Sequence, residues 1–157
     1  MVPLLWGLGL VFAKAVINEF PPILLMSLRF FLAAVIMFWF AKFPQNNVKN
    51  LLKISLIAAV LQYSLTFTGL KGLDAGTASI ILQLEVPFLV LLGAIMLNEK
   101  PGFQKWIGIG VAFSGVVIIV GEANFSGEWF SLILVLSGAF SWAVGQIYIR
   151  KLKNIDG

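Results

Sequence analysis

Six long apolar segments constrain the fold of this chain more than any other feature of its sequence. Each segment has about 16 to 23 residues, and short stretches with Pro, Gly, Asn and charged residues separate them. The 157 residues include only 11 Lys or Arg and 7 Asp or Glu, whereas a water-soluble domain of this length carries about 40 charged residues. So few charges cannot cover a water-exposed surface. The sequence therefore predicts an all-α polytopic protein embedded in the lipid bilayer.

The breaks between the apolar segments set the boundaries of the predicted transmembrane helices. We expect six helices, at about residues 2–17, 22–41, 51–70, 75–97, 104–121 and 129–149. A helix needs about 20 residues to cross the hydrocarbon core, so the first segment is short and the fifth is marginal. The short connections favour antiparallel neighbours within one bundle.

Small residues four positions apart indicate where two helices can approach closely. Such residues are Gly108 and Ala112, Gly110 and Ser114, and the series Ser137, Ser141 and Gly145. We expect them to lie at contacts between helices.

The basic residues outside the predicted helices lie almost entirely on one side of the membrane. Eight follow the second, fourth and sixth segments, and the opposite side has only Lys71. The eight are Lys42, Lys49, Lys53, Lys100, Lys105, Arg150, Lys151 and Lys153. Because cytoplasmic loops are enriched in Lys and Arg, this distribution predicts a cytoplasmic N-terminus.

Charge and composition also restrict the chemistry that we expect. The net charge is +4, but the basic residues lie at the ends of apolar segments rather than on one continuous face, so we expect no nucleic-acid partner. The chain has no Cys and no His, which excludes disulfides, thiolate nucleophiles and imidazole acid–base chemistry. We expect no metal site and no tightly bound cofactor.

The first and last apolar segments contain similar sequences. Residues 6–14 (WGLGLVFAK) align without gaps on residues 142–150 (WAVGQIYIR), with matching Trp, Gly, aromatic and cationic positions. Chance similarity of two apolar helices is the alternative. A repeating unit of five helices places its second copy in the opposite orientation, which is an inverted repeat typical of secondary transporters.

The inverted repeat predicts two parts in the chain. Residues 1–121 would form the first repeat, and residues 122–157 would form an outer loop and the first helix of a truncated second repeat. A missing second repeat or a second chain would then complete a ten-helix protein.

Two stretches of the sequence resemble a known family. LLWGLGLVFAKAVINEFPPILLMSLRFFLAA is similar to the opening of the EamA-type transporters of the drug/metabolite transporter superfamily. GLKGLDAGTASIILQLEVPFLVLLGAIMLNEK, followed by KWIGIGVAFSGVVIIVG, resembles the third-to-fifth helix region of that family. Within the superfamily, GTASIILQ and AFSWAVGQIYIRKL look most like exporters of amino acids and cysteine-pathway metabolites.

The resemblance implies a ten-helix exporter of the bacterial inner membrane with a central cavity near the midplane. Such a protein moves a small organic metabolite, here an amino acid or a derivative, by alternating access. Transport would be coupled to proton exchange, or it would occur by simple facilitated flow.

Besides Lys53 and Lys105 near helix ends, three charged residues lie within the predicted helices, where a charge costs about 2.5 to 3.5 kcal/mol at the helix centre. Lys14 lies one turn from a helix end, where its ammonium can snorkel to the interface. Arg29 and Glu85 lie deeper, about 10 Å and about 15 Å at 1.5 Å per residue. A carboxyl at the depth of Glu85 is protonated, paired with Arg29 or Lys14, or in contact with water. A static ion pair and a role in binding a substrate ammonium or a proton are both open.

Pro87 predicts a kink close to Glu85, because its nitrogen cannot donate a hydrogen bond to the carbonyl of Gln83. Transporter helices are often broken at the substrate site, so Pro87 is a candidate hinge. The predicted substrate-binding residues are Glu85, Gln83, Arg29, Lys14, Gln62 and Trp142. Interhelical hydrogen bonding is the alternative role of the uncharged residues.

Two other classes of protein are competing interpretations. A membrane-embedded enzyme on a lipid-linked substrate would need acidic pairs or His, and Glu85 is the only acid within the predicted helices. In a non-catalytic membrane subunit, the buried charges would only set the positions of the helices. We therefore favour a transporter over an enzyme.

Overall fold

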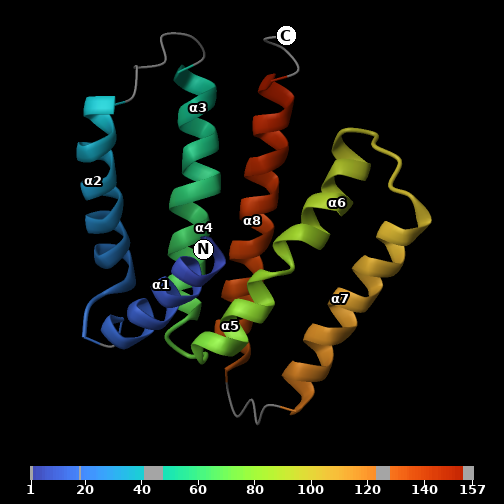
Figure 1. Cartoon of the computed structure of the whole chain (residues 1–157), viewed down its shortest axis with the longest axis horizontal. Helices are drawn as coiled ribbons and strands as arrows, with labels where there is room; N and C mark the ends of the chain where they lie inside the picture. The colour runs from blue at the N-terminus through green and yellow to red at the C-terminus, as the bar shows by residue number, and fades with distance from the viewer. Residues whose placement is uncertain (1, 18, 41–47, 123–127, 154–157) are drawn as a thin grey trace.

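The computed structural model describes residues 2–17, 19–40, 48–122 and 128–153, and all regular structure in these ranges is helical (Figure 1). The elements are α1 (Val2–Val16), α2 (Pro22–Phe40), α3 (Val48–Ser55), the π-helical turn η1 (Leu56–Leu61), α4 (Gln62–Gly69), α5 (Ala75–Leu82), α6 (Glu85–Met96), α7 (Phe103–Glu122) and α8 (Trp129–Lys153).

Five helical segments are long and apolar enough to cross a membrane: α2, the continuous α3–η1–α4 segment, the α5–α6 pair, α7 and α8. α1 has 15 residues and is shorter than these five, in agreement with its short apolar run. The predicted all-α polytopic fold is confirmed. The boundaries differ by a few residues, since the third segment begins at Val48 and α8 continues to Lys153.

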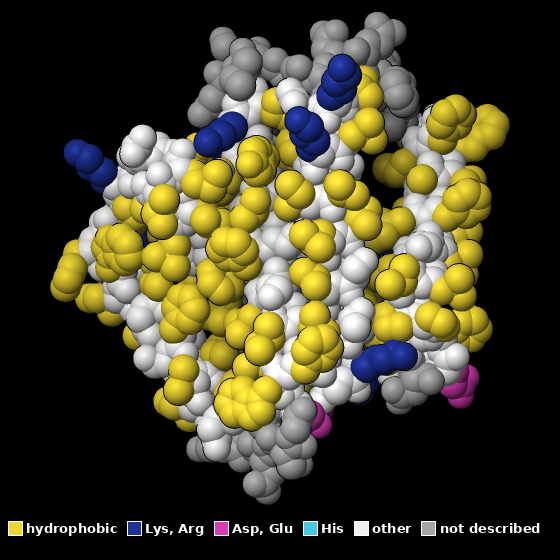
Figure 2. Space-filling model, turned by 180° about the vertical axis from the view of Figure 1, so that it is seen from behind, with side chains coloured by type: hydrophobic (Ala, Val, Ile, Leu, Met, Phe, Trp, Pro, Cys, Tyr) yellow, Lys and Arg dark blue, Asp and Glu magenta, His cyan; other side chains and the backbone are white. Residues whose placement is uncertain are grey.

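The two ends of the bundle differ in charge. The end of α2, the start of α3, the α6–α7 connection and the end of α8 lie at the same end of the bundle (Figure 1). Lys and Arg side chains gather toward this end, and the acidic side chains visible from behind lie toward the other (Figure 2). Lys42 lies outside the described residues.

α8 lies at the centre of the bundle although it is the last helix in the chain. It contacts α3, η1, α4, α5 and α6, and it is the most buried of the five long segments. Each outer helix packs on an inner one: α1 on α5, α2 on α4, and α7 on α5 and α6. Side chains such as Ile81, Leu84, Val135 and Ala139 fill the core between them.

Glycines bring α8 close to the third segment. A Cβ atom on Gly145 would collide with the Cβ of Ala58, and one on Gly138 would collide with the hydroxyl of Thr66. The predicted close contact at Gly145 is therefore confirmed. The same prediction is wrong for Gly108 and Gly110, since a Cβ on either would meet no described atom within 4 Å. Both lie on the outer side of α7, where no described helix packs.

The π-helical turn η1 lies next to this contact. Ser141 of α8 donates its hydroxyl hydrogen to the carbonyl of Ile57 at 2.8 Å, so a polar group of one helix binds the backbone of its neighbour. π-helical turns are rare and are often found at functional sites. This one ends directly before Gln62.

The fourth segment is broken in its middle. α5 ends at Leu82 and α6 begins at Glu85. The N–H groups of Gln83 and Leu84 donate to carbonyls only three residues earlier, at 3.1 Å and 3.0 Å, which tightens the chain into a turn that is not α-helical. Two half-helices therefore replace one straight helix.

The structure changes the expected role of Pro87. Pro87 is the third residue of α6, and the first turn of a helix tolerates Pro because its N–H would have no partner there. The break precedes it, at residues 83 and 84. The prediction that the carbonyl of Gln83 is unpaired is wrong, because the N–H of Val86 donates to it at 3.3 Å.

Asp74 caps the first of these half-helices. Its Oδ1 accepts a hydrogen bond from the backbone N–H of Thr77 at 2.9 Å. The pKa of Asp74 lies below its usual value of 3.8, mainly because the Thr77 side chain hydrogen-bonds to the charged carboxylate, with further hydrogen bonds from backbone N–H groups; burial opposes this shift. The charged carboxylate therefore stabilises the start of α5.

Replacing Asp74 with Ala is expected to lower the free energy of unfolding by about 1 kcal/mol at pH 7, the usual value of a lost N-cap. Because the folded pKa is the lower one, the stabilisation by the charge is present above pH 3.8 and is lost as the pH falls through the folded pKa. Thermal unfolding in detergent at pH 7 and at lower pH measures both effects. Asp74→Asn keeps a capping oxygen and is the control. Equal stability of Asp74→Ala and the unmodified protein at pH 7 would contradict the capping role.

Candidate functional site

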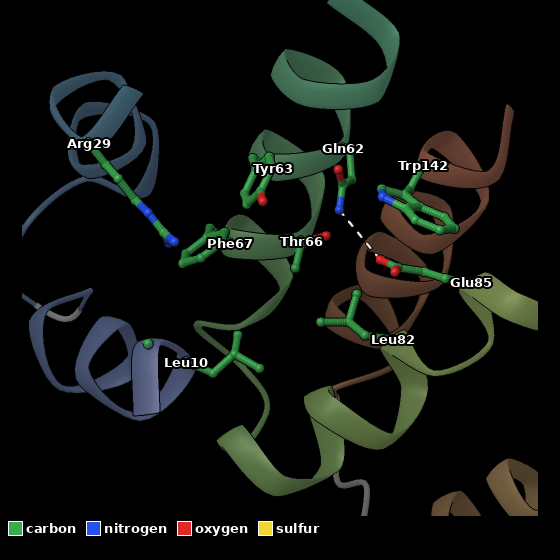
Figure 3. A pocket seen from close by; sticks show the side chains of 10 residues that line it. Leu10, Arg29, Gln62, Tyr63, Thr66, Phe67, Leu82, Glu85 and Trp142 are labelled. Carbon is green, nitrogen blue, oxygen red and sulfur yellow. Dashed lines mark hydrogen bonds between the residues drawn. The ribbon is translucent and has the colours of Figure 1, made fainter. Parts of the chain in front are cut away.

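A polar cavity lies beside the π-helical turn and the broken helix. Its volume is about 240 Å³, and residues from α1, α2, α4, α5, α6 and α8 line it (Figure 3). The two irregular elements place polar side chains here: Gln62 follows η1, and Glu85 is the first residue after the break.

Gln62 and Glu85 point toward each other across the cavity, with Trp142 of α8 beside them (Figure 3). The Nε2 of Gln62 donates to Oε1 of Glu85 at 3.4 Å, which is long for such a bond. Glu85 is half-buried and lies at the N-terminus of α6, where the helix dipole favours a negative charge. The carboxyl group therefore has free acceptor capacity toward the cavity.

Two buried oxygen atoms at the cavity have no hydrogen-bond partner among the described residues. They are Oε1 of Gln62 and Oγ1 of Thr66. The side chains that carry them are only 7% and 3% exposed, so bulk water does not reach them freely. An unsatisfied buried polar group costs about 1 to 3 kcal/mol. Neither oxygen has exposed surface, and the hydroxyl of Thr66 lies against Gly138 of α8, so the Glu85 carboxyl is the acceptor that a ligand in the cavity would reach.

Arg29 lies on the other side of α4 from Glu85, with Tyr63 and Phe67 between them (Figure 3). Tyr63 stacks on Phe67 with ring centroids 5.9 Å apart, and Phe30 meets the edge of Tyr63 at 4.9 Å. Aromatic rings therefore separate a cationic end of the cavity from an acidic end.

The structure brings together four of the predicted residues: Glu85, Gln62, Arg29 and Trp142 all line the cavity. The static ion pair offered as an alternative is not formed. Within the described ranges, the one ion pair joins Arg150 to Glu99, so Glu85 pairs with neither of the two candidate cations.

Lys14 and Gln83 lie outside the cavity lining. The ammonium of Lys14 donates to the carbonyls of Leu70 and Lys71 at 2.7 Å and 2.9 Å, where α4 ends, and cations favour that end of a helix. Gln83 is exposed at the break between α5 and α6. Lys14 thus connects α1 to the end of α4.

Thr66 is the cavity residue that the sequence analysis missed. It lies four residues after Gln62, on the same face of α4, and this spacing is the signal that could have found it. A single Thr in an apolar helix is otherwise unremarkable, because its hydroxyl usually bonds to a carbonyl of the preceding turn. Among the described residues, no three His, Cys, Asp or Glu side chains are grouped to hold a metal ion.

The fold and the cavity define a class: a polytopic helical membrane protein with a polar cavity beside a broken helix, as in transporters. The EamA-like transporter family matches residues 1–121, and the chain belongs to this family. The protein is thus a member of a transporter family rather than an enzyme, and the resemblance noted in the sequence is confirmed.

Several curated proteins are similar to this chain over nearly its whole length. A probable amino-acid metabolite efflux pump of Salmonella typhimurium is 34% identical, over 97% of this chain and 52% of that protein. The Escherichia coli protein of the same description is 32% identical, over 98% and 52%. An uncharacterized transporter of Archaeoglobus fulgidus is 26% identical, over 96% and 56%. The chain therefore spans about half the length of these relatives. No solved structure shows a significant match.

Proposed function

We propose that this chain forms the first repeat, and the first helix of an inverted second repeat, of an exporter of zwitterionic metabolites, namely amino acids or their derivatives. The observation that carries the proposal is the half-buried carboxyl of Glu85, which lines the polar cavity and has no cationic partner among the described residues. An acidic group of this kind at one end of a cavity suits a ligand ammonium. Two of the curated relatives are described as probable amino-acid metabolite efflux pumps, which supports the same substrate class.

The other end of the cavity suits a carboxylate. Arg29 offers five N–H donors in a planar fork that matches a carboxylate in two-point geometry. Tyr63 and Phe67 form the wall between the two ends. An α-amino acid carries its ammonium and its carboxylate on one carbon atom, so it would contact Glu85 and Arg29 together only after Tyr63 and Phe67 have moved aside.

The two half-helices support alternating access. α1 packs on α5, and α8 packs on both α5 and α6, so the break lies beside the two helices of the proposed repeat pair, α1 and α8. The break at residues 83 and 84, followed by Pro87, would serve as the hinge. Rocking of one repeat against the other would then move α6 and its first residue, Glu85, relative to α5.

The basic end of the bundle is proposed as the cytoplasmic side, which places the N-terminus in the cytoplasm and the protein in the bacterial inner membrane. Glu85 is the proposed carrier of a coupled proton. A non-catalytic subunit is the competing interpretation, but such a protein would gain nothing from buried acceptors without partners.

Arg29→Gln tests the proposed substrate class. Transport of labelled amino acids by proteoliposomes is measured in competition with two analogues: an amino-acid amide, which lacks the carboxylate, and an N-acetyl amino acid, which lacks the ammonium. Loss of a charge-assisted hydrogen bond costs about 1.5 to 3 kcal/mol, so the variant should bind the free amino acid ten- to a hundredfold more weakly. Binding of the amide should not change, because Arg29 has no carboxylate to contact there.

Arg29→Lys keeps the charge and is the matched control, with a smaller loss expected because the two-point geometry is gone. If Arg29→Gln weakens binding of the free amino acid and of the amide equally, Arg29 does not bind the carboxylate of the substrate. If none of the amino acids is transported by the unmodified protein, the zwitterion proposal is wrong.

A further inference from the structure

A second cavity, larger than the first, lies between α3–η1 and α8. Its volume is about 430 Å³. Four polar side chains lie on it: Asn50 and Lys53 from α3, and Tyr148 and Lys151 from α8. The remaining lining is aliphatic and includes Leu56 at the start of η1. We call this cavity the amphiphilic groove.

The amphiphilic groove is separate from the polar cavity. Lys151 follows Trp142 by nine residues, which at about 100° per residue places it half a turn away around α8. The two cavities also have no lining residue in common.

The groove also lies at a different depth. It lies at the basic end of the bundle, where α3 begins and α8 ends (Figure 1). From behind, basic side chains stand at this end above a broad hydrophobic surface (Figure 2). A lipid presents its charges in the same way, with a phosphate at the interface and acyl chains toward the membrane centre.

The charge in the groove is uncompensated. Neither Lys53 nor Lys151 forms an ion pair within the ranges that the structure describes, whereas the adjacent Arg150 pairs with Glu99 at 3.3 Å. Among the described residues, no carboxylate lines the groove. Two ammonium groups above an aliphatic floor are electrostatically complementary to an anion with an apolar tail.

We propose that the amphiphilic groove binds one anionic phospholipid at the cytoplasmic interface. The phosphate lies between Lys53 and Lys151, with the amide of Asn50 and the hydroxyl of Tyr148 as additional donors. An acyl chain covers the exposed face of Leu56, which is 60% exposed without it. Basic pockets between transmembrane helices on the cytoplasmic side are suited to anionic headgroups. The lipid thereby holds α3 and η1 against α8.

The test is native mass spectrometry of the protein in detergent with phosphatidylglycerol, with phosphatidylcholine as the neutral lipid. The unmodified protein should retain one phosphatidylglycerol in preference to phosphatidylcholine. In Lys53→Gln/Lys151→Gln, its dissociation constant should rise at least tenfold, at roughly fivefold per lysine near an anionic headgroup. Lys53→Arg/Lys151→Arg should bind as the unmodified protein does.

The matched control is Lys100→Gln/Lys105→Gln, which removes two charges at the same end but outside the groove; its dissociation constant should stay within about threefold. Equal loss of phosphatidylglycerol binding in both double variants would mean that the lipid is attracted diffusely to the basic end of the bundle, and it would overturn the proposed site. Displacement of the lipid by inorganic phosphate would show that the groove takes a free phosphate. Retention of no lipid by the unmodified protein, with Lys53 shielded from amine-reactive reagents, would show that protein covers the groove and would overturn the proposal.

Discussion

Replacing Glu85 with Gln is expected to reduce transport of the preferred amino acid about ten- to hundredfold. Glu85 supplies the one carboxyl group among the described residues that line the polar cavity, and a hydrogen bond to a charged group contributes about 1.5 to 3 kcal/mol. Gln has nearly the same shape, and its amide oxygen can still accept from Nε2 of Gln62. The local packing should therefore survive while the attraction for an ammonium is lost.

The pH dependence of transport separates the two roles proposed for Glu85. If it binds or releases a proton during the cycle, the rate of the unmodified protein varies with pH, and the rate of Glu85→Gln does not. If it only binds the ammonium, protonation weakens binding by the unmodified protein at low pH, but a transmembrane proton gradient does not change its rate at saturating substrate. Rates in proteoliposomes at saturating substrate, measured with and without a proton gradient, distinguish these results.

Glu99→Gln is the control for this experiment, because Glu99 is an exposed carboxylate at the basic end of the bundle, away from the polar cavity. Its transport rate should remain within about twofold of the unmodified protein. A Glu85→Gln protein with unchanged rate, affinity and pH profile would contradict a role of Glu85 in substrate binding and in proton coupling.

Replacing Gly145 with Val is expected to destabilise the bundle by about 3 kcal/mol or more. A Cβ at this position collides with the Cβ of Ala58 and lies 3.0 Å from its Cα, so relief requires a shift of backbone rather than rotation of a side chain. Overpacking of a well-packed contact costs about 1 to 3 kcal/mol, and occasionally more. Here the contact also aligns Ser141 with the carbonyl of Ile57.

Gly110→Val introduces the same side chain on α7, where no described atom lies within 4 Å of the new Cβ. Its thermal midpoint in detergent should stay within a few degrees of the unmodified protein, while that of Gly145→Val falls well below it. Equal midpoints for the two variants would mean that the α8 contact is not as close as the structure describes.

The apolar segments predicted the helices well, because immersion in lipid requires long apolar runs. The π-helical turn at Leu56–Leu61 was not predictable, since the segment LIAAVL contains no Gly or Pro and is suited to an ordinary helix. The central position of α8 in the bundle also could not be predicted from the sequence. Helices in lipid are apolar on every side, so periodicity does not reveal which face is buried.

Some residues of the site could be recognised from the sequence, whereas others could be recognised only from the folded structure. Glu85, Arg29 and Gln62 were recognisable because polar groups within the membrane are costly and need a reason. The contact of Lys14 with the end of α4 joins residues 56 and 57 positions apart, and nothing near Lys14 in the sequence indicates it. Thr66 became a candidate only when its hydroxyl was found buried without a partner.

The central position of α8 has a consequence for synthesis of the protein. A ribosome adds about 5 to 20 residues per second, so α8 emerges roughly 3 to 12 s after Gly69 has been made. During this interval the face of α4 that later meets the glycines of α8, and the carbonyl of Ile57 that Ser141 later binds, have no partner from α8. We therefore expect the earlier helices to remain incompletely packed in the membrane until α8 has been made. A ribosome that pauses between α7 and α8 would lengthen the period in which they can associate wrongly.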